Sequence, residues 1–115
     1  MNLVTLRPLG EIEQGILQEL KRRLGETFAC PVEIKPKANS LEHAYDPRRR
    51  QYLASAFLAI MSALGMEKGE KALGVADVDL YAPGLNFVFG EADIGSGVAI
   101  ISLWRLRQER YGLAP

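Results

Sequence analysis

The sequence predicts an α/β fold: a mixed five-stranded sheet with one antiparallel edge strand and two main helices. Two helical patterns alternate with strand-like segments, and three strand-like segments then follow in succession. Strand–helix–strand units favour parallel pairing through right-handed crossovers, whereas a short link between consecutive strands suits antiparallel pairing. The expected order is therefore β-α-β-α-β-β-β. The chain has 115 residues, near the common size of one domain, so we expect residues 1–115 to form a single domain.

The first strand–helix–strand unit occupies the N-terminal third. Residues 2–7 alternate weakly and predict a strand, which Pro8 is expected to end because proline cannot donate to a sheet ladder. Residues 11–24 carry apolar residues at spacings of three and four, the pattern of one helical stripe. Gly25 is placed to end that helix in a left-handed cap. Residues 31–35 then predict a short second strand.

The second helix is expected over residues 46–64. Asp46 is the expected N-cap, because its carboxylate can accept hydrogen bonds from the first amides of a helix. Pro47 fits the first helical position, where no N–H is needed. Residues 48–50, all arginine, would then lie in a solvated first turn. Gly65 is the expected terminator.

Three further strands are expected in the last third of the chain, and residues 106–111 predict a helix start or a connecting loop. The strands are residues 71–81, 85–91 and 98–103. The turn sequences Ala82-Pro83-Gly84 and Gly95-Ser96-Gly97 separate them. The second of these leads into a strand rather than a helix N-terminus, so we interpret it as a turn and not as a phosphate-binding loop.

Composition argues against several classes of partner. Fourteen basic and fourteen acidic residues cancel, so no overall charge attracts nucleic acid or an anionic membrane. The basic cluster at residues 48–50 has no interleaved aromatic residues on which bases could stack. No apolar run approaches the roughly 20 residues of a membrane span, and the N-terminus lacks the layout of a signal peptide. We expect no nucleic acid or membrane partner and a cytoplasmic location.

Metal-binding residue types are scarce. His43 is the only histidine and Cys30 the only cysteine, whereas a catalytic zinc site normally has three protein ligands and a water. We interpret His43 as an exposed loop residue and Cys30 as a small hydrophobic residue. Asp77 and Asp79 alternate onto one strand face but are too few for calcium, and a solvent-facing edge or contacts with a neighbouring loop explain them better. We expect no metal site and no catalytic residue.

Four segments carry a family resemblance: residues 44–49 (AYDPRR), 74–81 (GVADVDLY), 85–92 (LNFVFGEA), and Ser102 with residues 105–107 (RLR). They resemble the archaemetzincins, a metzincin-type family of zinc metallopeptidases. The resemblance implies the upper subdomain of a metzincin, in which a mixed five-stranded sheet carries two helices. The family binds zinc through HExxHxxGxxH on a following helix, and this chain lacks that sequence. The resemblance therefore covers the N-terminal part only, with zinc in the full-length family and an inactive chain by itself.

The same resemblance implies a substrate-binding edge. Metzincins bind substrate as an extra strand along the antiparallel edge of the sheet, where main-chain hydrogen bonds supply affinity. The residues expected to form this edge are Phe87, Val88, Phe89, Gly90, Glu91 and Ala92. Glu91 is its only charge, and an edge with little charge is equally suited to self-association. The expected partner is a peptide or protein segment, or a second copy of the chain.

Two functions follow from these expectations. The chain is either the scaffold and substrate-facing edge of an archaemetzincin-like zinc peptidase, or a non-catalytic interaction module that uses the edge strand or an uncovered sheet face. A missing zinc helix would uncover part of an apolar face, which predicts self-association or a missing C-terminal half. A natural truncation, a fragment and half of a two-chain enzyme all fit the sequence. An unrelated α/β enzyme is less well supported, since no acid–base constellation is evident.

Overall fold

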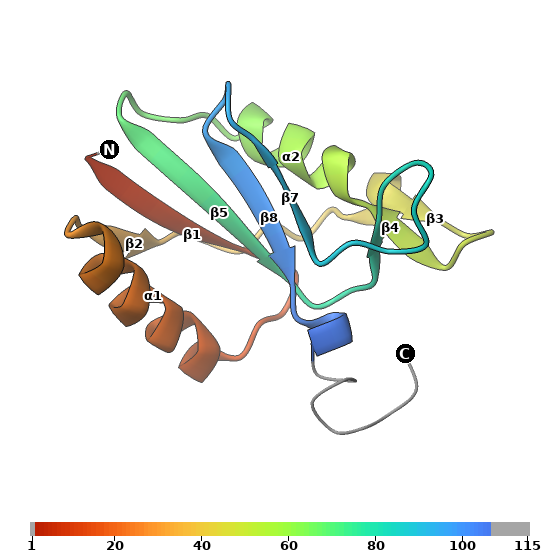
Figure 1. The fold of residues 1–115 in the computed structure, drawn as a ribbon, viewed down its shortest axis with the longest axis horizontal. Helices are drawn as coiled ribbons and strands as arrows, with labels where there is room; N and C mark the ends of the chain where they lie inside the picture. The colour runs from red at the N-terminus through yellow and green to blue at the C-terminus, as the bar shows by residue number, and fades with distance from the viewer. Residues whose placement is uncertain (1, 107–115) are drawn as a thin grey trace.

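The computed structural model describes residues 2–106 and shows a sheet with one helix on each face (Figure 1). The elements are β1 (Leu3–Leu9), α1 (Gln14–Phe28), β2 (Val32–Ile34), the 3-10 helix η1 (Glu42–Ala44), β3 (Tyr45–Asp46), β4 (Gln51–Leu53), α2 (Ala54–Ala63), β5 (Glu70–Ala76), β6 (Leu80–Tyr81), β7 (Gly90–Asp93) and β8 (Val98–Ser102). No helix in the described part is long and apolar enough to cross a membrane.

The main sheet has the strand order β2-β1-β5-β8-β7. The pairs β1–β2, β1–β5 and β5–β8 are parallel, and β7 pairs antiparallel with β8 at the edge. Residues 94–97 form the turn between β7 and β8, and Gly97 takes a positive φ of 76° there. The mixed five-stranded sheet with one antiparallel edge strand and two main helices is confirmed.

Side chains of alternate residues in β5 pack into two separate hydrophobic cores, one on each face of the sheet. Val75 lies with Leu6 and Leu17 beneath α1, whereas Ala72 and its same-face neighbours lie beneath α2. This alternation is expected of a central parallel strand that is buried on both faces. The α2 core contains Phe57, Leu80 and Ile100 at 0% exposure. Gly74 allows α2 to approach closely, because a Cβ there would lie 2.6 Å from the Met61 sulfur.

Strand β1 continues through Pro8 to Leu9, so the expectation that Pro8 ends it was wrong. The Pro8 carbonyl accepts a hydrogen bond from Ala38 N at 2.9 Å, which places the backbone of Pro8 toward the side of β2. Strand β2 has already ended at Ile34. The position where Pro8 lacks an N–H therefore lies past the last hydrogen bond between β1 and β2. The proline removes no hydrogen bond from that strand pair.

Helix α1 is displaced by several residues from its expected range. It begins at Gln14 and continues past Gly25 to Phe28, and the left-handed cap is Ala29 with φ 51°. A glycine inside a helix costs only about 1 kcal/mol. Leu17, Leu20 and Leu24 before the glycine and Cys30 after the helix all pack in the β1–β2 core, and this burial on both sides of Gly25 outweighs the cost.

The expected start of the second helix is a β-hairpin instead. The Asp46 carboxylate does accept hydrogen bonds from Arg48 N at 2.9 Å and Arg49 N at 3.4 Å. These bonds close the turn between the antiparallel strands β3 and β4, and Arg50 ends it with φ 55°. Helix α2 starts only at Ala54. An aspartate followed by proline accepts hydrogen bonds from the same following amides in a turn and at the start of a helix. The sequence therefore could not distinguish the hairpin from a helix start.

Glycine ends α2 as expected. Gly65 has φ 89°, and its N–H donates to Ser62 O at 3.2 Å.

The third expected strand is divided. Strand β5 stops at Ala76, and β6 pairs with β4 in a separate three-stranded sheet of order β3-β4-β6, which the sequence did not predict. The fourth expected strand begins late, since residues 85–89 form a loop that includes one isolated bridge from Val88 to Leu80. The fifth is confirmed as β8. Of the helix or loop expected at residues 106–111, Leu106 is helical, and residues 107–111 lie outside the described residues.

Candidate functional site

The antiparallel edge strand β7 presents main-chain groups away from the sheet. Ser102 N donates to Phe89 O at 2.8 Å, and the same register pairs Glu91 with Ile100. Residues in an antiparallel pair alternate between those bonded to the neighbour and those whose N–H and C=O point away. Gly90 and Ala92 are the alternate residues of β7. Their donors and acceptors therefore point away from β8.

Gly90 is required by the close approach of β7 to β8. A Cβ at Gly90 would overlap the carbonyl oxygen of Ile100 and lie 3.3 Å from Ile101 Cγ2. Gly90 and Ala92 share one sheet face with Ala99 and Ile101, their partners across the ladder. The open face of the edge strand thus carries no bulky side chain of its own.

Only half of the expected edge segment lies in the strand. Gly90, Glu91 and Ala92 belong to β7, whereas Phe87, Val88 and Phe89 lie in the loop that precedes it. The Phe87 and Phe89 rings meet edge to face with centroids 5.3 Å apart. Val88 N donates to Leu80 O at 2.9 Å. The loop is therefore anchored to β6 rather than continuing the edge.

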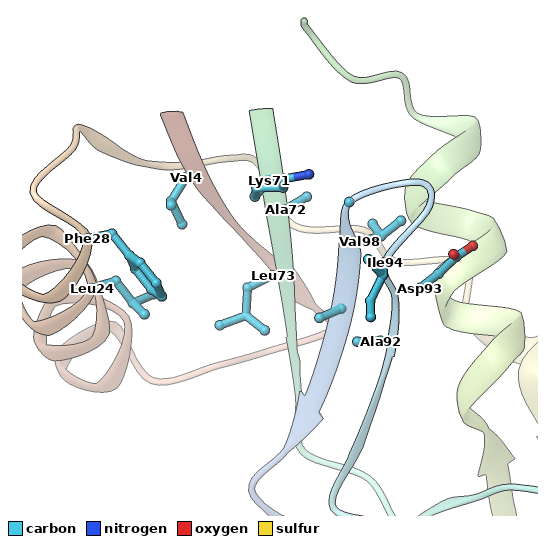
Figure 2. A pocket seen from close by; sticks show the side chains of 12 residues that line it. Val4, Leu24, Phe28, Lys71, Ala72, Leu73, Ala92, Asp93, Ile94 and Val98 are labelled. Carbon is cyan, nitrogen blue, oxygen red and sulfur yellow. The ribbon is translucent and has the colours of Figure 1, made fainter. Parts of the chain in front are cut away.

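Beside this edge lies an apolar groove with a cavity volume of about 410 Å³. Figure 2 shows Leu24 and Phe28 of α1 on one side, Ala92 and Ile94 on the other, and Leu73 of β5 between them. Helix α1 packs mainly on β1 and β2 and reaches β5 at Val75, and it leaves the part of this face around Leu73, Ala92 and Ala99 open. Ile94 is 91% exposed and Phe28 48%. The groove and the outward-facing edge are continuous through Ala92.

Comparisons with known proteins point to one family. The archaemetzincin of Pyrococcus abyssi is 40% identical over 121 residues, which cover 100% of this chain and 64% of that protein. The archaemetzincin of Methanocaldococcus jannaschii is 40% identical over 112 residues, which cover 97% of this chain and 60% of that protein. No protein-family model matches.

Solved structures agree with the sequence relatives. The archaemetzincin of Archaeoglobus fulgidus, crystallised with malonate, superposes with a TM-score of 0.78 at 31% identity, over 90% of this chain and 62% of that one. The chain is an archaemetzincin homologue. A zinc-dependent peptidase from Methanocorpusculum labreanum superposes with a TM-score of 0.80 at 29% identity, over 96% of this chain and 69% of that one. The resemblance inferred from the sequence is confirmed.

The archaemetzincin homologue spans about 60% of the length of the curated relatives that it matches, with 64% and 60% for the two named above. The superposed structures give the same picture, since the chain covers 62% of the Archaeoglobus fulgidus chain. The edge strand and the groove therefore belong to a part of an archaemetzincin-like architecture, and the activity of whole relatives does not follow from them.

The side chains that the structure describes do not fit a three-ligand zinc site. Within residues 2–106, no three His, Cys, Asp or Glu side chains lie close enough to hold a metal ion. His43 is exposed in η1, and Cys30 is half-buried after α1. The whole sequence contains one histidine. No hydrolytic step through zinc is therefore assigned to side chains of this homologue.

An ion pair that the sequence did not predict links the chain after β8 to the segment between β5 and β6. Arg105 Nε and Nη2 donate to the two carboxylate oxygens of Asp79 at 2.9 and 3.0 Å, and the two side chains are 18% and 15% exposed. The Arg105 guanidinium carbon lies 4.2 Å from the centroid of the Phe87 ring. Asp79 thus contacts a neighbouring segment, as one of the two interpretations of the sequence expected, and its partner there is Arg105. Only the folded arrangement brings Asp79 and Arg105 together, 26 residues apart in sequence.

Gln51 joins this cluster from the small sheet. Its side-chain amide donates to Asp79 Oδ2 at 3.1 Å and to Asn86 O at 2.7 Å, and Gln51 itself is 7% exposed. A buried amide with two such acceptors holds its neighbours in one arrangement. The loop that leads into the candidate edge is therefore fixed from both sides, by Gln51 and by Arg105.

Proposed function

We propose that this chain forms the scaffold and substrate-facing edge of an archaemetzincin-like zinc peptidase and is inactive by itself. The observation that carries the proposal is the pair Gly90 and Ala92, whose main-chain groups point away from the sheet on its antiparallel edge. A peptide would add to β7 as a sixth strand. The M. labreanum relative is described as a zinc-dependent peptidase, which supports a peptide as the ligand.

The edge supplies binding and orientation. Gly90 and Ala92 offer up to four main-chain hydrogen bonds, each with a net contribution of about 0.5–1.5 kcal/mol. Alternate side chains of an added strand would face the apolar groove beside Ala92. Zinc in the full-length family would supply an activated water. Because residues 2–106 hold no set of zinc ligands, we assign this part of the chain peptide positioning and no chemical step.

The main-chain role can be tested by removing a single outward donor. Ala92→Pro deletes the N–H that points away from β8 and leaves the β7–β8 hydrogen bonds in place, since proline is tolerated on the open side of an edge strand. We expect at least threefold weaker binding of an extended, neutral decapeptide, measured by fluorescence anisotropy. Ala92→Ser keeps the donor and is the matched control. Equal affinity of wild type and Ala92→Pro would contradict edge pairing.

The proposed inactivity of the isolated chain can be tested by metal analysis and by a peptide cleavage assay. We expect no stoichiometric zinc by metal analysis of purified protein and no cleavage of a quenched peptide. One tightly held zinc per chain would overturn this part of the proposal, because it would require a ligand set outside residues 2–106 or one formed on association.

A second candidate is a non-catalytic interaction module, favoured by the exposed apolar groove. Its occupant would be a second copy of the chain or a separate C-terminal half. A stable monomer by light scattering over a wide concentration range would argue against the second copy. We further propose a cytoplasmic location, since a single cysteine excludes an intrachain disulfide and suits a reducing compartment.

A further inference from the structure

We propose that Arg48 and Arg50, at the tip of the β3–β4 hairpin, select peptides with acidic side chains on the C-terminal side of the segment bound to β7. This inference rests on the proposed function and adds a substrate class to it. The two residues are hereafter called the arginine tip. The sequence predicts this basic cluster in the first turn of a helix, exposed to solvent. The structure places it in a hairpin turn instead, next to the loop that leads into the edge strand.

The middle arginine fixes the hairpin to the loop before the edge strand. Arg49 Nη2 donates to Leu85 O at 2.7 Å, and its guanidinium carbon lies 3.9 Å from the centroid of the Tyr81 ring. Arg49 Nε also donates to Gln51 Oε1 at 3.0 Å. A cation stacked on a ring and bonded to a carbonyl is held in one orientation. The tip is thereby held beside residues 85–86.

The arginine tip itself is exposed and unneutralised within the described residues. Arg48 and Arg50 are exposed, and neither forms an ion pair with another residue of the range 2–106. The nearby acids have other partners: Asp46 accepts the turn amides, and Asp79 binds Arg105. With a net chain charge of zero, the positive potential is local to this turn rather than a property of the whole surface.

The backbone of Arg50 gives an independent reason to look for a function. Its φ of 55° lies in the left-handed region, where glycine or asparagine would be less strained. A non-glycine residue held there is strained, and such strain concentrates at functional sites. The chain thus keeps a charged side chain where turn geometry alone favours a smaller residue.

The tip lies beyond the N-terminal end of β7, on the same side of the sheet as the loop of residues 82–89 (Figure 1). Asn86 precedes Gly90 by four residues, which span at most about 14 Å even when fully extended. Antiparallel pairing is the more stable alternative for an added strand. In that direction, the residues of the peptide that follow the one opposite Gly90 run toward residues 85–86 and the arginines.

These relations define a positional preference. An extended peptide advances about 3.3 Å per residue, so side chains roughly two to four residues past the one opposite Gly90 come within reach of the arginine tip. Glutamate or aspartate at those positions would be attracted, whereas the same residues at the other end of the peptide would not. Exposed ion pairs are weak and screened by salt, so the preference is moderate and depends on ionic strength.

Three decapeptides test the inference on the intact chain. Two have the same composition, with two glutamates near the C-terminal end or near the N-terminal end, and the third has glutamines in place of the glutamates. We expect the first to bind about threefold to tenfold more tightly than the others at low salt, and the difference to vanish near 0.5 M salt. Arg48→Glu with Arg50→Glu should reverse the order. Lysine at both positions should retain most of it.

The outcomes separate the inference from the proposed function. Equal binding of all three peptides, with Ala92→Pro still weakening each, would overturn the acidic preference and leave the edge proposal intact. No binding of any peptide would overturn both. Binding of a single-stranded oligonucleotide that is lost in the double glutamate variant would also overturn the inference, since the tip would then recognise phosphate. Arg50→Gly relieves the strained backbone, so its melting temperature at or above wild type shows that lost selectivity is not lost folding.

Discussion

At the scale of single residues, two glycines determine how closely the elements around the site approach. Gly74 lies where α2 packs on β5, and Gly90 lies where β7 meets β8. A side chain at Gly74 would meet movable side-chain ends, whereas one at Gly90 would meet the Ile100 backbone. Backbone atoms yield less easily than side chains. Gly90 is therefore the position at which the smallest substitution should alter the candidate edge.

Gly90→Ala tests this closeness. We expect the added methyl group to push the start of β7 away from Ile100 O and to lower the free energy of unfolding by about 1–3 kcal/mol, the range of overpacked sites. Amide hydrogen exchange should increase at the N–H groups of Glu91 and Asp93, which face β8. Ala92→Gly, which adds no bulk on the same face of β7, is the control. Unchanged exchange in Gly90→Ala would show that the strand can shift without losing its ladder.

At the scale of elements, periodic segments could be predicted and short ones could not. The body of helix α2 follows from an apolar stripe long enough to show a period, and strand β8 follows from an unbroken apolar run. Strands β3 and β6 have two residues each, too few for any alternation to appear. Asp46 satisfies the same amides in a turn as at a helix start, so local chemistry could not decide between them. Only the pairing of β3 with β4 does.

The candidate site shows the same division. Resemblance placed the edge at residues 87–92, and the strand begins at Gly90 because Phe87 and Phe89 are held in a loop by contacts that are distant in sequence. Aromatic and branched residues favour strands in general, so composition alone predicts one there. The ion pair between Asp79 and Arg105 gave no signal that one sequence could reveal.

That ion pair should stabilise the loop and hold its orientation. Breaking a largely buried pair leaves a charge poorly solvated. We expect Asp79→Ala and Arg105→Ala each to cost about 1–3 kcal/mol and to show a coupling of about 1 kcal/mol or more in a double-mutant cycle followed by urea unfolding. Because Arg105 also stacks on Phe87, peptide affinity should fall together with stability. Additive losses would show that the two side chains act separately. Arg22→Ala, which removes exposed ion pairs with Glu19 and Glu26 on α1, should lower stability less than either of these two variants.

At the scale of the whole molecule, the two faces of the sheet are covered unequally. Helix α2 covers β5, β8 and β7 on one face, whereas α1 covers mainly β1 and β2 on the other and leaves the groove of Figure 2 open. Soluble proteins rarely leave a contiguous apolar area exposed unless something binds there. The curated relatives are longer than this chain. The exposure of this open face therefore depends on whether another protein segment packs against it.

Self-association through this face gives the last prediction. Ile94→Asp and Phe28→Ser replace exposed apolar side chains on opposite sides of the groove, so each should reduce the association constant about tenfold or more while changing stability by less than about 0.5 kcal/mol. Sedimentation equilibrium measures the first quantity and urea unfolding the second. Leu64→Ser is the matched control, because Leu64 is 50% exposed at the end of α2 and does not line the groove. A wild-type chain that is monomeric at every concentration would contradict the prediction. Loss of association in Leu64→Ser alone would place the interface on the α2 side instead.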